Sequence, residues 1–480
     1  MTPVSYGDIF RILTPETILE VVSLLVLFVD LAWLRRASQA VRMRTASLLG
    51  AFGSLLSLLW LLPNHAAISA MGGALVSDTT VAALQAGILG LTVLVLLLGI
   101  RERFSRNPGE YVALVLLATT GMLLVAAARD LLLIFVSLEL LSLSLYVLAA
   151  FAKARAASAE SALKYYLFGG ISAAFMLFGF SYLYGLAGTT YLPAIAARLS
   201  QLPLSPIELV AFVLVAVGLG FKVAAAPFHL WAPDTYAGAP APVAALIASG
   251  SKVASFAVLI AVTAALVPAW GWTAALLCMA AASILLGNLS ALVQTSVRRI
   301  LACSAIAHAG YMLLGIAAHT TASNQAVLVY ALTYALTTVG AFAVVALVER
   351  STGSDRLDAF AGLSARSPLV AATLLVFLLS LAGIPPLVGF WVKFQLFAAV
   401  LQAPAATGWG LGMVVLAIAG SAVSLYYYLQ VLKRAYVTAS ADSSPIDVTP
   451  LESFLLVLLA AAVLVLGLFP GLISGFFAMF

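Results

Sequence analysis

Charged residues are scarce in this chain: Asp, Glu, Lys and Arg make up 9% of its 480 residues, whereas hydrophobic residues make up 64%. Soluble domains carry about 25% charged residues, so this composition excludes an ordinary water-soluble fold. Apolar segments of about 20 residues, the length that crosses roughly 30 Å of hydrocarbon, recur along the whole chain and exclude a protein with a single anchor. The alternating pattern of a membrane β-barrel is missing. The sequence therefore predicts an all-α polytopic membrane protein.

Cysteines and basic clusters are also few. The two cysteines, Cys278 and Cys303, both fall inside apolar segments. No spacing typical of a metal or redox site joins them, so we expect packing residues and no metal site. The formal net charge of +5 is spread along the chain, which gives nucleic-acid binding no support. The first residues lack a basic segment followed by a cleavage site, so no removable targeting peptide is expected.

The apolar runs predict about fourteen membrane-spanning helices. We place them near residues 18–34, 46–62, 81–100, 111–128, 131–151, 162–186, 207–231, 241–267, 272–293, 300–318, 325–348, 369–401, 408–432 and 451–477. With this count, most Lys and Arg residues of the connections fall on one side of the membrane. Because such loops face the cytoplasm, both termini are expected on the periplasmic side of a bacterial inner membrane.

The connections between these spans are short. The longest, near 187–206, 349–368 and 433–450, have about twenty residues each, which is too few for a soluble domain. We therefore expect no nucleotide, flavin or iron–sulfur site in this chain. If the protein takes part in redox chemistry, its partner subunits hold the cofactors.

Four lysines and Glu139 lie inside predicted spans, where each mid-helix charge costs about 2.5–3.5 kcal/mol. They are Glu139, Lys164, Lys222, Lys252 and Lys393. At membrane depth such groups mark ion or proton pathways. Lysine suits proton transfer because burial disfavours its charged form, so that the ammonium group releases its proton more readily. A structural ion pair is the alternative for Glu139, and snorkelling to the surface is equally compatible with Lys164, which we place in the first turn of its helix. Lys252 is expected in mid-helix among small residues.

Two histidines add candidates for proton transfer. His308 shares a predicted helix face with Ser304 and Tyr311, which would form a polar stripe in an apolar helix. A neutral histidine bonded between helices is the alternative. His229 and Asp234 lie in the short segment PFHLWAPD, where they would line an opening on the cytoplasmic side or cap a helix end.

Proline interrupts the seventh and twelfth predicted spans. Pro227 in the former, and Pro385 with Pro386 in the latter, remove backbone donors and disfavour helix at the preceding residue. Interrupted helices at corresponding places indicate inverted repeats with sites at the breaks. The breaks are five helices apart, so helices 4–8 and 9–13 form the two predicted repeats. The expected division is 1–110, 111–267 (first repeat), 268–432 (second repeat) and 433–480.

The stretches FKVAAAPFHLWAPDTYAGAPAPVAALIASGSKVASF (221–256), IAHAGYML and LAGIPPLVGFWVKF resemble the antiporter-like subunits of respiratory complex I, and most of all the N type. The chain stops soon after the fourteenth span, unlike the L type, and has lysine at position 393, where the M type resembles this pattern with glutamate. Related subunits occur in multisubunit cation/proton antiporters and membrane-bound hydrogenases.

The resemblance implies a proton-translocating subunit of NADH:quinone oxidoreductase that works beside other membrane subunits. It makes Glu139 the partner of Lys222, Lys252 the central lysine and Lys393 the residue near the outward exit, and it strengthens Lys164 as a candidate. His308 would pass the proton from Lys252 to Lys393. NADH, FMN, iron–sulfur clusters and quinone are then expected in partner subunits. Two alternatives stay open: a Na⁺/H⁺ antiporter or hydrogenase subunit, and a structural spacer without proton flux.

Overall fold

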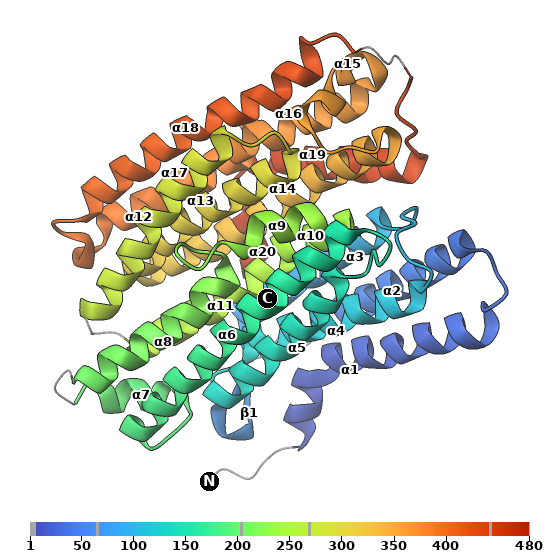
Figure 1. Cartoon of the computed structure of the whole chain (residues 1–480). Coiled ribbons are helices and arrows are strands. Elements are labelled where there is room, and N and C mark those ends of the chain that lie inside the picture. Colours follow the sequence, from blue (N-terminus) through green and yellow to red (C-terminus); the bar gives the residue numbers. More distant parts are fainter. Residues whose placement is uncertain (1–5, 64–66, 202–204, 267–269, 441–443, 480) are drawn as a thin grey trace. The chain divides into compact units, whose positions relative to one another are not determined.

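The computed structural model describes residues 6–63, 67–201, 205–266, 270–440 and 444–479, about four-fifths of them in helices (Figure 1). Thirteen helices within these residues are long and apolar enough to span a membrane. Two shorter apolar helices, α16 (Pro368–Ala382) and α17 (Val388–Gln402), occupy the place of the predicted twelfth span. In the described part of the chain, the strands β1 (Ile68–Ala70) and β2 (Leu75–Ser77) form a hairpin, and the other β pairing consists of isolated bridges. The predicted all-α polytopic fold is confirmed.

The chain forms two compact units. The first contains Met1–Val223, Gly238–Ala275 and Ser474–Phe480, and the second contains Ala224–Ala237 and Leu276–Ile473. The first unit holds α1 (Tyr6–Phe28), the π-helix η1 (Val29–Trp33), α2 (Gln39–Leu61), η2 (Met71–Gly73), α3 (Thr79–Leu98), α4 (Pro108–Ala127), α5 (Leu131–Ala149), α6 (Ala156–Ala187), α7 (Leu192–Leu199), α8 (Pro206–Val223), α10 (Ala241–Ala248) and α11 (Gly250–Leu266).

The second unit holds nearly all the remaining helices. They are α9 (Trp231–Gly238), most of α12 (Trp270–Leu292), α13 (Val297–Ala317), α14 (Thr321–Thr352), η3 (Leu357–Phe360), α15 (Leu363–Arg366), α16, α17, η4 (Pro404–Ala406), α18 (Gly410–Tyr436) and α19 (Pro450–Leu468). The last helix, α20 (Gly471–Ala478), crosses the boundary of the two units.

Side-chain caps fix where several helices begin. Asp130 accepts hydrogen bonds from the backbone N–H groups of Leu132 and Leu133 at the start of α5, and Thr320 and Thr449 form capping boxes at the starts of α14 and α19. These side chains satisfy donors that a helix start leaves open. Because helices with fixed ends hold their side chains at defined depths, the caps also position the buried charges.

The two proline breaks lie where the sequence predicts them. α8 ends at Val223 and α9 begins at Trp231, so residues 224–230 around Pro227 are not helical. α16 ends at Ala382 and α17 begins at Val388, with Gly383 in a left-handed conformation after the first of them. The missing donor of each proline explains the interruptions.

Four expectations about helix boundaries were wrong. The eighth span breaks at Ser249, so Lys252 lies in the first turn of α11 instead of mid-helix; the Ser249 hydroxyl donates to the Ala245 carbonyl, which competes with backbone bonding. The sixth begins at Ala156, because its alanines favour helix, so Lys164 is two turns inside. The first begins at Tyr6 and includes Pro15. The last ends at Leu468, before Pro470.

Candidate functional site

Glu139 and Lys222, both in the first unit, lie together as expected. Glu139 is near the middle of α5, and Lys222 is in the last turn of α8. The Lys222 Nζ atom is 3.7 Å from the nearer carboxylate oxygen of Glu139, with 5% of the lysine side chain exposed. Lys222 donates its hydrogen bond to the hydroxyl of Ser142 instead. The arrangement is therefore an ion pair without a direct hydrogen bond.

Helix geometry explains this cluster. Ser142 lies three residues after Glu139 on α5, so both side chains share one face of that helix. Lys222 lies where α8 ends, and the free carbonyl groups of a helix end favour a cation. The Phe221 ring lies 5.7 Å from the Lys222 ammonium and stacks on Tyr165. Aromatic packing thus covers the ammonium, whereas 23% of the Glu139 side chain is exposed.

Lys252 is among the most deeply buried large side chains of the chain, with 2% of its surface exposed. It is the third residue of α11, directly after the interruption at Ser249. The start of a helix carries positive partial charge, which adds to the cost of an ammonium group there. Lys252 thus occupies a different electrostatic setting from Lys222, although both belong to the first unit.

Lys393, in the second unit, binds the end of the broken helix α16. Its Nζ atom donates to the carbonyl oxygens of Leu381 and Ala382 at 2.9 and 3.0 Å, and to the Ser421 hydroxyl at 2.8 Å. It also lies 5.4 Å from the centre of the Tyr311 ring. The interruption at 383–387 leaves these carbonyl groups without helical N–H partners, and the Lys393 ammonium group donates hydrogen bonds to them instead.

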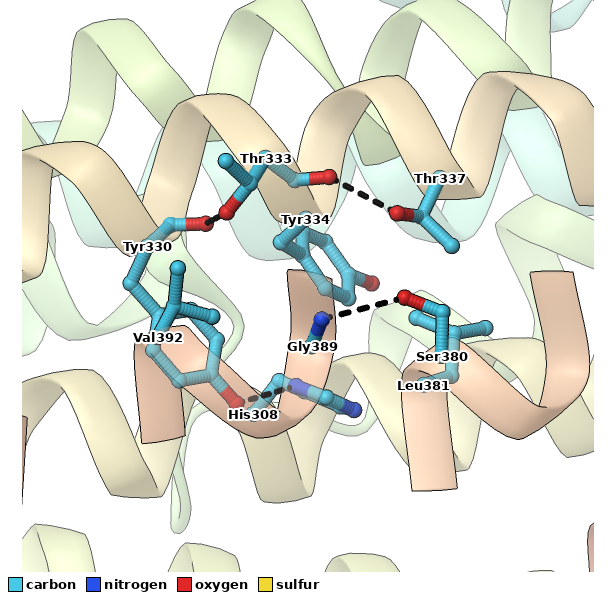
Figure 2. Close-up of a pocket in the computed structure, with 9 residues that line it drawn as sticks. All are labelled: His308, Tyr330, Thr333, Tyr334, Thr337, Ser380, Leu381, Gly389 and Val392. Atoms are coloured by element: carbon cyan, nitrogen blue, oxygen red, sulfur yellow. Dashed lines mark hydrogen bonds between the residues drawn. The ribbon is translucent and has the colours of Figure 1, made fainter. Parts of the chain in front are cut away.

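His308 lies near Lys393's helix in a polar region of the second unit. Its Nδ1 atom forms a hydrogen bond of 2.7 Å with the Tyr330 hydroxyl (Figure 2). A cavity of about 10 Å³, the room of a single water molecule, adjoins them. It is lined by His308, Tyr330, Thr333, Tyr334, Thr337, Ser380, Leu381, Gly389 and Val392, from α13, α14, α16 and α17 (Figure 2). The cavity thus has room for one water molecule beside the α16 end.

The predicted stripe on α13 is hydrogen-bonded to other helices. Ser304 pairs with the hydroxyl of Tyr428, and the Tyr311 hydroxyl accepts from the Asn288 amide at 3.3 Å. Tyr427 donates to the Asn288 amide oxygen at 3.1 Å. These bonds join α12, α13 and α18 through buried polar groups.

The secondary candidates are less enclosed. Lys164 pairs with Glu160 one turn earlier at 2.6 Å, with side chains 39% and 66% exposed; exposed pairs of this kind contribute little stability. Asp234 forms an ion pair with Arg299 at the start of α13. His229 lies half-buried in segment 224–230, and its buried Nδ1 atom has no hydrogen-bond partner among the described residues. None of these three joins the Glu139–Lys222 cluster through a hydrogen bond that the structure describes.

Several site residues escaped the sequence analysis. Ser142 lies one turn from Glu139 on α5, whereas Tyr330 on α14 and Asn288 on α12 lie on helices without any candidate. The spacing Glu139–Ser142 was a usable signal, because it places both on one helix face. Cys303 is buried as expected, but Cys278 is exposed on α12. The described residues contain no His/Cys/Asp/Glu group suited to a metal ion.

Comparison with known proteins places this arrangement in a family. The family model described as NADH:quinone oxidoreductase/Mrp antiporter, transmembrane, matches residues 128–419. That range contains Glu139, Lys222, Lys252 and Lys393. The chain belongs to the NADH:quinone oxidoreductase/Mrp antiporter family.

Its relatives in that family include N-type subunits. NADH-quinone oxidoreductase subunit N 2 of Acidobacterium capsulatum is 50% identical over 98% of this chain and 99% of its own length. F(420)H(2) dehydrogenase subunit N of Methanosarcina mazei is 43% identical over 76% of each chain. A chain of respiratory complex I from Thermus thermophilus, solved with aureothin, has a TM-score of 0.82 at 36% identity, covering 96% of this chain and 98% of that one. The chain is thus an antiporter-like, multi-pass integral membrane protein of the N type.

Proposed function

We propose that the chain translocates protons as the N-type membrane subunit of a respiratory NADH:quinone oxidoreductase. The observation that carries the proposal is the buried Lys222 ammonium, 3.7 Å from Glu139 and bonded to Ser142, because ionisable groups at membrane depth serve proton pathways by default. The similarity to subunit N 2 of Acidobacterium capsulatum over nearly its full length supports the assembly.

In the resting state Lys222 is charged and Glu139 attracts it. A pair at this distance gains about 4 kcal/mol at an effective dielectric constant of 20. Moving one charge against 100 mV costs about 2.3 kcal/mol. Separating the pair removes a stabilisation of the charged lysine that is larger than this cost, so the lysine can lose its proton against a membrane potential. The free energy for the separation comes from quinone reduction in partner subunits.

The proton then passes to Lys252, and in the second unit it is carried by His308 to Lys393. Lys222, Lys252 and Lys393 each lie within a few residues of a helix interruption. Irregular backbone at membrane depth persists where it is buried in protein or lines a wet cavity, which suits proton transfer. Lys164, His229 and Asp234 act as secondary groups, the last two on the cytoplasmic side.

The orientation and the internal symmetry belong to the same proposal. Residues 111–267 and 268–432 form inverted repeats, flanked by 1–110 and 433–480, and both termini face the periplasm of a bacterial inner membrane. Protons move outward. NADH, FMN, iron–sulfur clusters and quinone are bound by partner subunits, and the neighbours of this chain are the other membrane subunits and lipid.

The test is Lys222→Ala in the native complex, reconstituted in sealed vesicles. We expect normal assembly and a lower number of protons translocated per electron, because the site can no longer carry a proton. Lys153→Ala, in an exposed connection, is the matched control. An unchanged proton-to-electron ratio in Lys222→Ala would support a structural spacer.

A cation/proton antiporter or hydrogenase subunit is the second candidate, because the matching family model also covers Mrp antiporters. The effect of a sodium gradient on proton movement distinguishes the two candidate functions. If a sodium gradient drives proton movement through the purified assembly, and no flavin or iron–sulfur subunit copurifies, the antiporter is correct. Electron transfer from NADH to quinone with insensitivity to sodium supports the redox-driven pump.

A further inference from the structure

A carboxyl group is buried in the N-terminal helices, apart from the groups discussed so far. Glu16 lies on α1 and is 3% exposed. The Gln85 amide of α3 donates to its Oε1 atom at 3.3 Å and to the Leu123 carbonyl of α4 at 3.2 Å. The Oε2 atom of Glu16 has no hydrogen-bond partner among the described residues. This carboxyl is therefore enclosed but weakly bonded.

The contacts of the Glu16 carboxyl group are polar, and charged groups lie elsewhere on the packed helices. Ser57 of α2 donates to the Pro15 carbonyl at 3.0 Å, next to Glu16. The ionisable groups of the packed elements are Tyr6, Asp8, Arg11, Glu20 and Asp30 on α1 and η1, Arg42 and Arg44 on α2, Glu110 and Tyr111 on α4, and Asp78 and Arg129 beyond the ends of α3 and α4. Helix α3 and strands β1 and β2 carry none. Arg42 pairs with Asp30.

The chemistry of the site selects its ligand. An ionised carboxylate without a paired cation is very costly in an apolar interior, whereas a neutral acid needs only modest hydrogen bonding. In the described part of the chain no ion pair involves Glu16. A metal cation would need several oxygen ligands, yet Gln85 presents an N–H donor to Oε1. A proton is the cation that fits.

We propose that Glu16 is a proton-binding site separate from Glu139 and the buried lysines, and that it exchanges its proton with the side of the membrane on which α3 begins. Gln85 is six positions after Thr79, the first residue of α3, so it lies about 9 Å from that helix end. Leu123 is four positions before Ala127, the last residue of α4, or about 6 Å from that end. The carboxyl group is therefore near one surface. This inference does not depend on the proposed function.

Infrared spectroscopy of the complete membrane assembly tests the proposal. The wild-type spectrum minus that of Glu16→Gln should contain the C=O band of a neutral carboxylic acid at neutral pH. Glu16→Asp should shift this band instead of removing it, which guards against a variant that misfolds. The control is Glu160→Gln, whose side chain is 66% exposed and paired with Lys164, and which should remove only ionised-carboxylate bands. Carboxylate bands from Glu16 would overturn the proposal.

The direction of exchange is tested in sealed vesicles of known orientation. Raising the pH in the compartment that faces the start of α3 should cause loss of the neutral band, and raising it in the other compartment should not. A band that follows the other compartment, or neither compartment, would overturn the exchange route. Proton pumping is not read out here, so failure of this inference and failure of the proposed function are distinguishable.

Discussion

The carboxylate of Glu139 lies 3.7 Å from the Lys222 ammonium and makes no hydrogen bond to it. Ser142, on the next turn of the same helix, receives that hydrogen bond. A closed ion pair would hold the proton on the lysine strongly, and a distant carboxylate would not hold it at all. The Ser142 hydroxyl therefore leaves Glu139 close enough to attract the ammonium without a direct hydrogen bond. A site that alternates between binding and releasing a proton needs this intermediate strength.

Removing this hydroxyl should slow proton release. In Ser142→Ala the Glu139 carboxylate can close on the lysine and form a direct hydrogen bond. A hydrogen bond to a charged group is worth about 1.5–3 kcal/mol, so we expect the pumping rate to fall by about ten- to a hundredfold. The rate is measured with a pH dye in vesicles driven by the electron donor. Ser144→Ala is the control, because Ser144 donates to the Leu140 carbonyl on its own helix. Faster pumping in Ser142→Ala would contradict the explanation.

Substitutions of Lys393 should distinguish its role in capping α16 from its role in proton transfer. Lys393→Gln keeps two N–H donors for the α16 carbonyl groups but carries no exchangeable charge, so we expect a stable chain without full pumping. Lys393→Glu places carboxylate oxygens beside the carbonyl oxygens at the end of α16. Both kinds of oxygen are hydrogen-bond acceptors, and each unsatisfied carbonyl costs about 1–3 kcal/mol. Thermal unfolding of the purified assembly should therefore occur at a lower temperature for the glutamate than for the glutamine variant. Equal stability of the two would refute the capping role.

Tyr330→Phe should impair transfer through the second unit while the fold persists. It removes the hydroxyl that bonds His308 and leaves the ring in place. The loss of one hydrogen bond corresponds to a fall in pumping rate of up to about tenfold. Proton flux in vesicles is the measurement, and Tyr184→Phe, 53% exposed on α6, is the control. Wild-type flux in Tyr330→Phe would remove His308 from the pathway.

Arg42→Ala should destabilise the first unit. Both carboxylate oxygens of Asp30 accept from Arg42, at 2.7 and 2.6 Å, and the backbone N–H of Gly109 donates to one of them. Removing one member of a buried ion pair costs about 3–5 kcal/mol, because the remaining charge is uncompensated. Thermal stability of the purified assembly measures the loss. The exposed Arg44 provides the control variant Arg44→Ala, which should leave stability unchanged.

The sequence was sufficient for features that depend on single residues. Pro227 and the Pro385–Pro386 pair predict their breaks because proline lacks a backbone donor. Lysine in an apolar run predicts a buried charge at positions 222, 252 and 393, although Lys164 is 39% exposed. The interruption at Ser249 has no such marker, since serine and glycine occur in helices as well as at breaks. Its position depends on a side chain bonding backwards to Ala245.

Hydrogen-bond partners on different helices could not be predicted from the sequence, for a different reason. Tyr330 lies 22 residues from His308, and Ser142 lies 80 residues from Lys222, so only the packing of the helices brings them together. Glu16 was passed over because the first span was predicted at 18–34, after this residue. The helix instead continues through Pro15, with Thr14 and Thr17 bonding back to its carbonyl groups.

The three hydrogen bonds of Lys393 have a consequence for the unloaded state of the site. A neutral amine retains two N–H donors, enough for both α16 carbonyl oxygens, and gains a lone pair that can accept from the Ser421 hydroxyl. The Ser421 hydroxyl, which donates to the Ala382 carbonyl at 3.1 Å when the lysine is charged, would turn to the amine, and Ala382 would keep its hydrogen bond from Lys393. Departure of the proton leaves no orphaned partner, so the end of α16 can stay intact through every cycle. An arginine, which never gives up its charge, could not alternate in this way.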